Sequence, residues 1–280
     1  MRIPSAVALS DFAQECKADV DARKAKRQVL VHNGTCGIAS GSKLVKSYLE
    51  EHLRGDGKVL IRDTSCCGAC HQEPMVTVIE PDGSQVIYGD LTEDKLARIV
   101  KEHLVGGRPV KDLLTDGTNP FFQKQVKRVT RLLGLIDPYD IRDYIAHNGY
   151  QALAKVLSLP REKVIEEVTK SGLKGRGGAG FPTGMKWSFA AKAQGSPKYV
   201  ICNADEGDPG AYMDRAIVEG CPHSVIEGLS TAAYAIGANK GYVYIRAEYP
   251  LAVEVLRNAI TQARESGLLG ANILGRGFDF

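Results

Sequence analysis

Apolar positions in the first 105 residues alternate between the period of a strand and the period of a helix. Short apolar runs predict strands over 28–32, 58–62, 75–79 and 85–88, and amphipathic runs predict helices over 5–27, 42–53 and 94–104. Residues 81–83, Pro-Asp-Gly, mark a hairpin turn between the last two strands. The predicted order is therefore helix, strand, helix, three strands and helix.

The pattern changes after residue 105. Turn formers at 106–109 and 115–120 predict a linker, and three helical patterns follow within 121–170. One of them covers 139–147 and begins after an Asp137-Pro138 capping signal. Beyond them we expect a helix to 193, a strand over 198–202, a strand and turn over 243–250, a helix over 251–265 and the start of a further strand over 277–280.

These elements predict an α/β protein with room for two domains in its 280 residues. We expect an N-terminal helix (1–27), a first α/β domain (28–112), a linker with a helical collar (113–170) and a second α/β domain (171–280). The net charge of +3 is dispersed, which argues against a nucleic-acid partner. The sequence shows neither a signal peptide nor an apolar run near the roughly 18 residues of a membrane span, and it reads as cytoplasmic.

The most unusual stretch is glycine-rich, with five glycines in the ten residues 175–184. Glycine costs backbone entropy and buries no side chain, so this run indicates a backbone that approaches a ligand closely, most simply a phosphate-bearing cofactor. A Rossmann fingerprint needs a strand before it, but residues 161–170 have a helical pattern. A P-loop is excluded because Met185 separates Gly184 from Lys186.

A second polar group follows the predicted strand 198–202. Asn203, Asp205, Glu206 and Asp208 come at the carboxyl end of that strand. Carboxylates and amides suit hydrogen bonds to sugar hydroxyls and ring nitrogens better than contacts with bare phosphate, which carboxylates repel. Together with the glycine run they predict a site for a flavin and a nucleotide.

The chain has seven cysteines, and the group Cys66, Cys67 and Cys70 is too tight for an ordinary disulfide framework. Cys36 follows the first predicted strand, and this group follows the second. Cys36, Cys66 and Cys70 therefore supply three of the four thiolates that a 2Fe–2S cluster needs. The order of strands and helices around them has a thioredoxin-like outline.

Residues 172–187 and 202–211 closely resemble the FMN- and NADH-binding subunit of respiratory complex I. The resemblance is closest to the flavin subunits of soluble NAD-linked hydrogenases and formate dehydrogenases. It implies a Rossmann-like FMN-binding domain that transfers hydride between NAD(H) and FMN and passes electrons to iron–sulfur clusters. The implied partners are an iron–sulfur electron-transfer subunit and a hydrogenase or formate dehydrogenase catalytic subunit.

The resemblance also implies roles for individual residues. Residues expected to bind the cofactors are Gly175, Arg176, Gly177, Gly178, Phe181, Lys186, Phe189, Asn203, Asp205 and Glu206. Among them, the two phenylalanines are expected to stack with the NADH base. Glu206 and Asp208 are the candidate catalytic residues, and Asp208 stands where complex I subunits usually carry Glu.

The first α/β domain resembles the thioredoxin-like 2Fe–2S domain that is fused to hydrogenase flavin subunits. Cys66 and Cys70 match the second cysteine pair of that domain, but the first pair departs from it because His32 precedes Cys36 with no second cysteine. Cys67 or His32 could supply the fourth ligand. The alternatives are a degenerate cluster in a docking module and a zinc site.

The family continues beyond the point that corresponds to residue 280, with a Gly-Glu-Glu flavin motif, a ubiquitin-like domain and a 4Fe–4S domain. We therefore expect the FMN-binding domain to be incomplete at the C-terminus and the chain to be a fragment or one part of a split protein. The alternative function is that of a non-catalytic electron-transfer or docking fragment.

Overall fold

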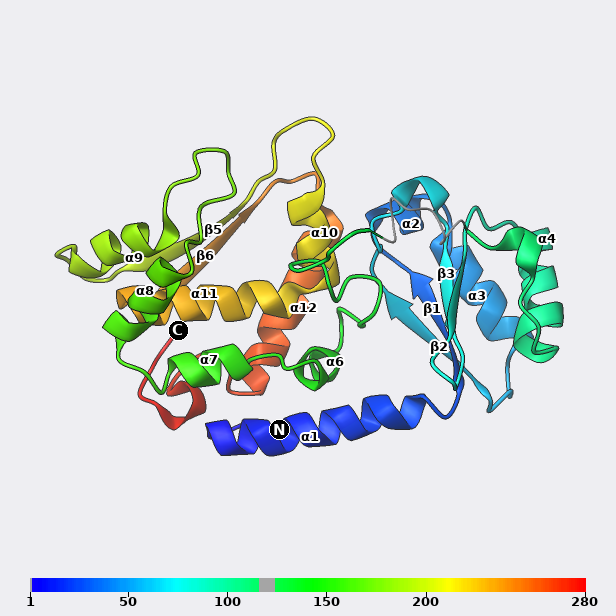
Figure 1. Ribbon diagram of the computed structural model, residues 1–280, viewed down its shortest axis with the longest axis horizontal. Coiled ribbons are helices and arrows are strands. Elements are labelled where there is room, and N and C mark those ends of the chain that lie inside the picture. Colours follow the sequence, from blue (N-terminus) through cyan, green and yellow to red (C-terminus); the bar gives the residue numbers. More distant parts are fainter. Residues whose placement is uncertain (1, 116–123) are drawn as a thin grey trace. The chain divides into compact units, whose positions relative to one another are not determined.

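The structure is a computed structural model that describes residues 2–115 and 124–280 (Figure 1). The chain divides into two compact units. The cysteine unit comprises Cys16–Tyr144 together with Tyr212–Cys221. The glycine-loop unit comprises the segment up to Glu15, Ile145–Ala211 and Pro222–Phe280. The predicted linker residues after Thr115 and the start of the helical collar, up to residue 123, lie outside the described residues.

These units differ from the predicted division in two places. Helix α1 (Ala6–Arg23) was predicted as a separate part, but its residues are divided between the two units. Residues 212–221 come from the middle of the predicted second domain, yet they pack with the cysteine unit.

The cysteine unit confirms the predicted order of elements. Its elements after α1 are β1 (Arg27–His32), α2 (Thr35–Ala39), α3 (Ser42–His52), β2 (Val59–Thr64), β3 (Val76–Ile79), β4 (Gln85–Tyr88), α4 (Glu93–Arg98), which continues as a wider turn over Ile99–Val105, and α10 (Met213–Gly220). Short 3-10 turns lie at Cys70–Gln72 and Lys111–Leu113.

The sheet of this unit has the order β2-β1-β3-β4. Strand β1 pairs with β2 in parallel and with β3 in antiparallel orientation, and its residues Val29, Leu30 and Val31 are fully buried. His32 and Thr64, which end β1 and β2, are in register. Because parallel strands end at the same edge of a sheet, the loops carrying the cysteines emerge side by side.

The core of the cysteine unit is formed where α3 and α4 pack on the sheet. Apolar side chains from every layer contribute to it: Val29, Val31, Val45, Leu49, Leu53, Val76, Val78, Tyr88, Leu91, Leu96, Ile99, Val100, Leu104 and Val110. The Tyr88 hydroxyl is buried within this core and accepts a hydrogen bond from the backbone N–H of Val110 at 3.0 Å. This hydrogen bond ties the segment after the last helix back to the sheet.

The glycine-loop unit contains a two-stranded parallel sheet and a set of helices. Its elements are α7 (Gln151–Val156), α8 (Arg161–Lys170), α9 (Thr183–Lys192), β5 (Tyr199–Ala204), α11 (Pro222–Ile236), β6 (Lys240–Ile245), α12 (Pro250–Glu265) and a short turn at Ile273–Gly275, and α6 (Ile141–Ala146) spans the residue at which the two units divide. Strand β6 begins three residues before the predicted position, because Lys240 and Gly241 pair with Tyr199 and Val200 of β5 despite their low strand propensity.

The predicted strand over 277–280 is not found. Phe280 instead exchanges two backbone hydrogen bonds with Gly270, at 2.7 and 3.0 Å, and so closes a loop within its own segment.

Helix α11 is the centre of this unit, because it contacts α7, α8, α9, α12 and β5. Its buried Glu227 accepts hydrogen bonds from the backbone N–H groups of Tyr150 and Leu153, at 2.9 and 3.0 Å, and thereby caps α7. Within the described residues, no helix is both long and apolar enough to cross a bilayer.

Candidate functional site

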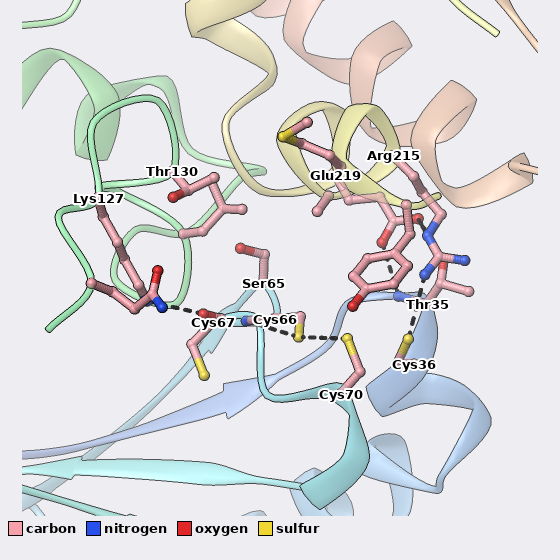
Figure 2. A pocket seen from close by; sticks show the side chains of 16 residues that line it. Thr35, Cys36, Ser65, Cys66, Cys67, Cys70, Lys127, Thr130, Arg215 and Glu219 are labelled. Atoms are coloured by element: carbon pink, nitrogen blue, oxygen red, sulfur yellow. Dashed lines mark hydrogen bonds and ion pairs between the residues drawn. The ribbon is translucent and has the colours of Figure 1, made fainter. Parts of the chain in front are cut away.

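Four cysteines line one pocket of about 280 Å³ in the cysteine unit: Cys36, Cys66, Cys67 and Cys70 (Figure 2). The Sγ atoms of Cys66 and Cys70 are 3.5 Å apart. Two thiolates bound to one tetrahedral metal at about 2.3 Å lie about 3.8 Å from each other. The Cys66–Cys70 pair is thus already spaced as two ligands of one metal ion.

Cys36 reaches the same pocket from the first turn of α2. The next residue, Gly37, lies so close to the end of β1 that an added Cβ would sit 2.0 Å from the carbonyl oxygen of His32. Glycine at 37 is therefore required by close packing, and this packing presents Cys36 to the pocket. The Sγ of Cys36 accepts a hydrogen bond from Arg215 Nη2 at 3.4 Å.

Cys67 lines the pocket but has a different orientation. In Figure 2 its sulfur points away from the row formed by the sulfurs of Cys66, Cys70 and Cys36. The backbone of Cys67 is held by Lys127, whose Nζ donates to its carbonyl oxygen at 3.0 Å. The role of Cys67 as fourth ligand stays a prediction.

His32 does not line the pocket. It is fully buried, and its Nε2 lies 2.9 Å from Thr77 Oγ1, while its Nδ1 lies 3.9 Å from Glu73 Oε1. Burial lowers the pKa of His32 to about 4 and raises the pKa of Glu73 to about 7. The structure therefore uses His32 as a neutral buried residue under the site and does not present it as the missing ligand.

Burial raises the pKa of the Cys36, Cys66 and Cys67 thiols. For Cys36 the neighbouring Cys70 acts in the same direction, and the charge of Arg215 opposes it. Metal binding at these thiols would release protons, since the thiolate is the ligand.

The cysteines of the pocket are candidate ligands for either a 2Fe–2S cluster or a zinc ion. Among residues 2–115 and 124–280, no three or more His, Cys, Asp or Glu side chains are grouped to hold a metal ion. The sulfurs of Cys66 and Cys70 nevertheless have the separation of a ligand pair, and Figure 2 shows the sulfur of Cys36 in the same row. A two-iron cluster takes its thiolates in pairs, two on each iron. The three thiols thus fit such a cluster better than a single zinc ion.

The glycine run forms a loop that is closed at its base. Lys174 and Pro182 form an isolated bridge, and the backbone N–H of Gly175 donates to Phe181 O at 2.9 Å. A Cβ added to Gly177 would meet no protein atom within 4 Å, and its φ is not in the left-handed region. Neither protein packing nor a left-handed backbone therefore requires glycine at 177, and the loop is open to solvent at this position.

Most predicted residues on this side of the unit are exposed. Arg176, Gly178 and Lys186 are open to solvent, and the rings of Phe181 and Phe189 are 41% and 61% exposed with centroids 6.5 Å apart. The helix after the loop thus brings the two phenylalanines together.

The acidic segment is a loop after β5. Asn203 Oδ1 accepts from the backbone N–H of Asp205 at 3.2 Å, and Glu206 has φ 50°, in the left-handed region. Asp205 and Glu206 are half-buried and Asp208 is exposed. In Figure 1 this loop and the glycine loop extend from the same side of the unit, one after β5 and the other between α8 and α9.

Sequence reasoning missed the residues that hold these loops. Arg246 Nη1 donates to Glu206 O at 2.9 Å and fixes the left-handed turn, and the Tyr249 hydroxyl donates to Ala211 O at 3.3 Å. Both follow β6, whose last residue Ile245 is in register with Ala204 of β5. That register, once predicted, would have placed Arg246 beside the acidic loop. Arg215 and Glu219 of α10 were also missed.

Residues 168–276 match the family described as the Nuo51 FMN-binding domain. Residues 20–104 match the thioredoxin-like [2Fe-2S] ferredoxin family. The two matches fall on the glycine and acidic loops and on the pocket cysteines, respectively.

Three curated relatives illustrate the similarity. The NADP-reducing hydrogenase subunit HndC of Solidesulfovibrio fructosivorans is 58% identical over 56% of this chain and 32% of its own length. A subunit of the NADH-quinone oxidoreductase of Aquifex aeolicus is 55% identical over 50% of this chain and 33% of its own. The NAD-reducing hydrogenase HoxS subunit alpha of Cupriavidus necator is 34% identical over 93% of this chain and 44% of its own.

The chain thus spans less than half the length of these curated relatives. The match to the HoxS subunit alpha extends over both units, and the other two cover about half of the chain. One polypeptide therefore carries a segment that matches the thioredoxin-like [2Fe-2S] ferredoxin family and a segment that matches the Nuo51 FMN-binding domain.

Proposed function

We propose that this chain is the flavin-bearing electron-input subunit of a NAD-linked oxidoreductase complex. When bound, FMN would supply hydride exchange with NAD(H) and would pass single electrons to iron–sulfur clusters. The observation that carries the proposal is the open space at Gly177, where no protein atom lies within 4 Å of an added Cβ.

The glycine loop and the start of α9 would hold the phosphate side of the flavin. The backbone N–H groups of Gly175, Arg176, Gly177 and Gly178 are the candidate donors. Lys186, in the first turn of α9, adds an exposed positive charge near the N-terminal end of that helix. Helix N-termini and cationic side chains both favour a bound phosphate.

The acidic loop would hold the polar parts of the flavin and the nucleotide. Asn203, Asp205 and Glu206 have the acceptor oxygens that suit ribityl hydroxyls and ring N–H groups. Glu206 and the exposed Asp208 would face the nicotinamide nucleotide. Arg246 keeps this loop in shape through its bond to Glu206 O, so the acceptors are positioned before the ligand binds.

Phe181 and Phe189 would stack with the adenine or nicotinamide ring. Their exposed faces and the 6.5 Å separation of their centroids leave a ring surface free to contact a planar base.

Cys36, Cys66 and Cys70 would hold the cluster, with Cys67 as the remaining thiol in the pocket. The proposed partners are an iron–sulfur electron-transfer subunit and a hydrogenase or formate dehydrogenase catalytic subunit, since two of the relatives are hydrogenase subunits. The exposed side chains Tyr199, Ile201, Tyr242 and Tyr244 form an apolar face on the small sheet and support assembly with further polypeptide.

The test is FMN-dependent reduction of ferricyanide by NADH, and in parallel by NADPH, with the purified chain. Gly177→Val is the matched variant, because a Cβ there would meet no protein atom within 4 Å, while the valine side chain would occupy the space proposed for the flavin. We expect FMN binding and activity in the wild type and at least tenfold weaker FMN binding in Gly177→Val.

Equal FMN affinity in the two proteins would contradict the proposed site. A wild-type chain that binds no FMN would support the alternative, a non-catalytic docking fragment of such a complex.

A further inference from the structure

Helix α10 forms one wall of the cysteine pocket, although it lies far along the chain from the cysteines. Tyr212, Met213, Arg215, Ala216 and Glu219 all line the pocket, and residues 212–221 belong to the same compact unit as the thiols. The end of this helix is packed tightly, since an added Cβ at Gly220 would lie 2.4 Å from Ser65 Oγ. Ser65 directly precedes Cys66, so α10 is fitted against the cysteine loop itself.

Arg215 is the residue of α10 that reaches a thiol. Its Nη2 donates a hydrogen bond to Cys36 Sγ at 3.4 Å, as the dashed line in Figure 2 shows. The Arg215 side chain is only 19% exposed. The guanidinium charge is therefore partly shielded from water where it meets the sulfur, which strengthens its effect on that atom.

Glu219 fixes both partners of this contact. Its carboxylate accepts from the backbone N–H of Thr35 at 2.9 Å and from the Thr35 hydroxyl at 2.5 Å, directly before Cys36. Glu219 is 5% exposed, and its Oε1 lies 4.0 Å from Arg215 Nε one turn earlier in the helix. The carboxylate thus holds the start of α2 and steers the guanidinium toward Cys36.

Hydrogen bonds and positive charge at a ligand sulfur stabilise the more negative, reduced form of an iron–sulfur cluster. Arginine suits this position because its planar guanidinium combines a positive charge with several N–H donors in a fixed geometry. The side chain also lies beside Cys36, which has no partner thiol in the spacing of the ferredoxin family.

We propose that Arg215 is a positioning residue of the iron–sulfur site. Arg215 binds the sulfur of Cys36 and raises the reduction potential of the cluster, and Glu219 holds Arg215 in place. This inference rests on the cluster of the proposed function. It adds a residue from the flavin-domain sequence to the ferredoxin site: Arg215 follows Asp208 of the acidic loop by seven positions. The segment that would contact the nucleotide therefore continues directly into the helix that contacts Cys36.

The test compares the reconstituted wild-type chain with Arg215→Gln, Arg215→Lys and the control Arg257→Gln. Arg257 is exposed on α12, and its substitution removes the same charge from the glycine-loop unit. Reduction is followed by the electron paramagnetic resonance signal at fixed potentials, with iron per chain measured in each protein. We expect Arg215→Gln to keep its iron and to shift the reduction equilibrium at least tenfold toward the oxidised cluster, which is about 59 mV for one electron.

Arg215→Lys should shift the equilibrium in the same direction by a smaller factor, and Arg257→Gln should match the wild type. An Arg215→Gln equilibrium within threefold of wild type would overturn the inference while leaving the cluster itself in place. A wild-type chain that takes up no iron would refute the cluster, and with it both the proposed ferredoxin site and this inference.

A second measurement applies if Arg215→Gln fails to take up iron. In the iron-free proteins, the rate of iodoacetamide modification of Cys36 at pH 8 is measured by peptide mass spectrometry, with Cys66 as internal reference. Loss of the guanidinium should lower the modification rate of Cys36 at least threefold relative to that of Cys66, since less of the Cys36 thiol is ionised. An unchanged or faster relative rate would contradict the contact.

Discussion

Gly184 in α9 and Thr169 in α8 are in direct contact: a Cβ added to Gly184 would lie 2.2 Å from Thr169 Oγ1 and 2.7 Å from Thr169 Cα. These two helices flank the glycine loop, which begins after α8 and ends where α9 starts. Their close approach, together with the hydrogen bond from Thr183 N to Leu173 O at 2.9 Å, sets the width of the loop at its base.

We predict that Gly184→Ala destabilises the glycine-loop unit by about 1–3 kcal/mol, because the methyl group forces the two helices apart. Trp187 is the single tryptophan of the chain and lies in this unit, so its fluorescence during urea unfolding measures the effect. Gly228→Ala in α11 is the control, since its added Cβ meets nothing within 4 Å and alanine favours a helix. Equal unfolding midpoints for the two variants would contradict this account.

The thiol pocket leads to a prediction on metal content. Anaerobically reconstituted wild-type chain should hold about two irons and two sulfides, and Cys70→Ser should remove them, because Cys70 pairs with Cys66 at ligand spacing. Cys16→Ala is the control, as Cys16 is buried in α1 and does not line the pocket. Iron and sulfide analysis checks both. Stoichiometric zinc without iron, or loss of iron in Cys16→Ala, would show that the ligand set is wrong.

The sequence was sufficient to predict the elements of the cysteine unit, because each of its strands and helices has a clear apolar period. It also brought Cys36, Cys66 and Cys70 together correctly. That success follows from one relationship, the parallel pairing of β1 with β2, which places the ends of both strands at one edge.

The contact of Arg215 with Cys36 could not be predicted, since the two residues are 179 positions apart and no local pattern relates them. The same holds for Glu219 and Thr35, which are 184 positions apart. Sequence motifs and the Nuo51 FMN-binding match over 168–276 both include α10, and only its packing reveals that α10 also lines the thiol pocket. The fourth thiolate ligand could not be derived from spacing alone, because spacing does not show where the sulfur of Cys67 points.

Acid should weaken the glycine-loop unit through His223. This side chain is 2% exposed, with Nδ1 2.8 Å from the Tyr150 hydroxyl and Nε2 3.3 Å from Gln262 Oε1. Burial lowers the pKa of His223 to about 4. The folded state therefore binds fewer protons than the unfolded state between about pH 4 and 6.5. The stability that comes from keeping His223 neutral is fully present above about pH 6.5, and it is lost as the pH falls through about 4.

The predicted loss of unfolding free energy between pH 7 and pH 4.5 is about 2–3 kcal/mol for this group. His223→Gln should remove that part of the pH dependence, whatever its effect on stability at pH 7. Urea unfolding followed by Trp187 fluorescence at both pH values measures it, with His52→Gln, an exposed site in the cysteine unit, as control. If His223→Gln loses as much unfolding free energy between pH 7 and pH 4.5 as the wild type does, the pH dependence comes from other groups.

The two aspartates of the acidic loop should differ in what they bind. Asp205 is half-buried at the end of β5, whereas Asp208 is exposed further along the loop. Asp205→Asn turns one acceptor oxygen into a donor at a contact proposed for FMN. The mismatch should cost about 1–3 kcal/mol, or roughly 5- to 150-fold in FMN affinity.

Asp208→Asn should leave the FMN affinity unchanged and raise the KM for the nucleotide, because the exposed carboxylate is proposed to face the nicotinamide side. Flavin fluorescence titration measures the first quantity, and NADH–ferricyanide kinetics with saturating FMN measure the second. Arg246→Gln tests the residue that supports this loop, because it removes the donor to Glu206 O and changes neither aspartate. It should lower the affinity for FMN and the affinity for the nucleotide together. If Asp208→Asn releases FMN while Asp205→Asn keeps the wild-type FMN affinity, the proposed roles are reversed: Asp208 contacts FMN and Asp205 faces the nucleotide.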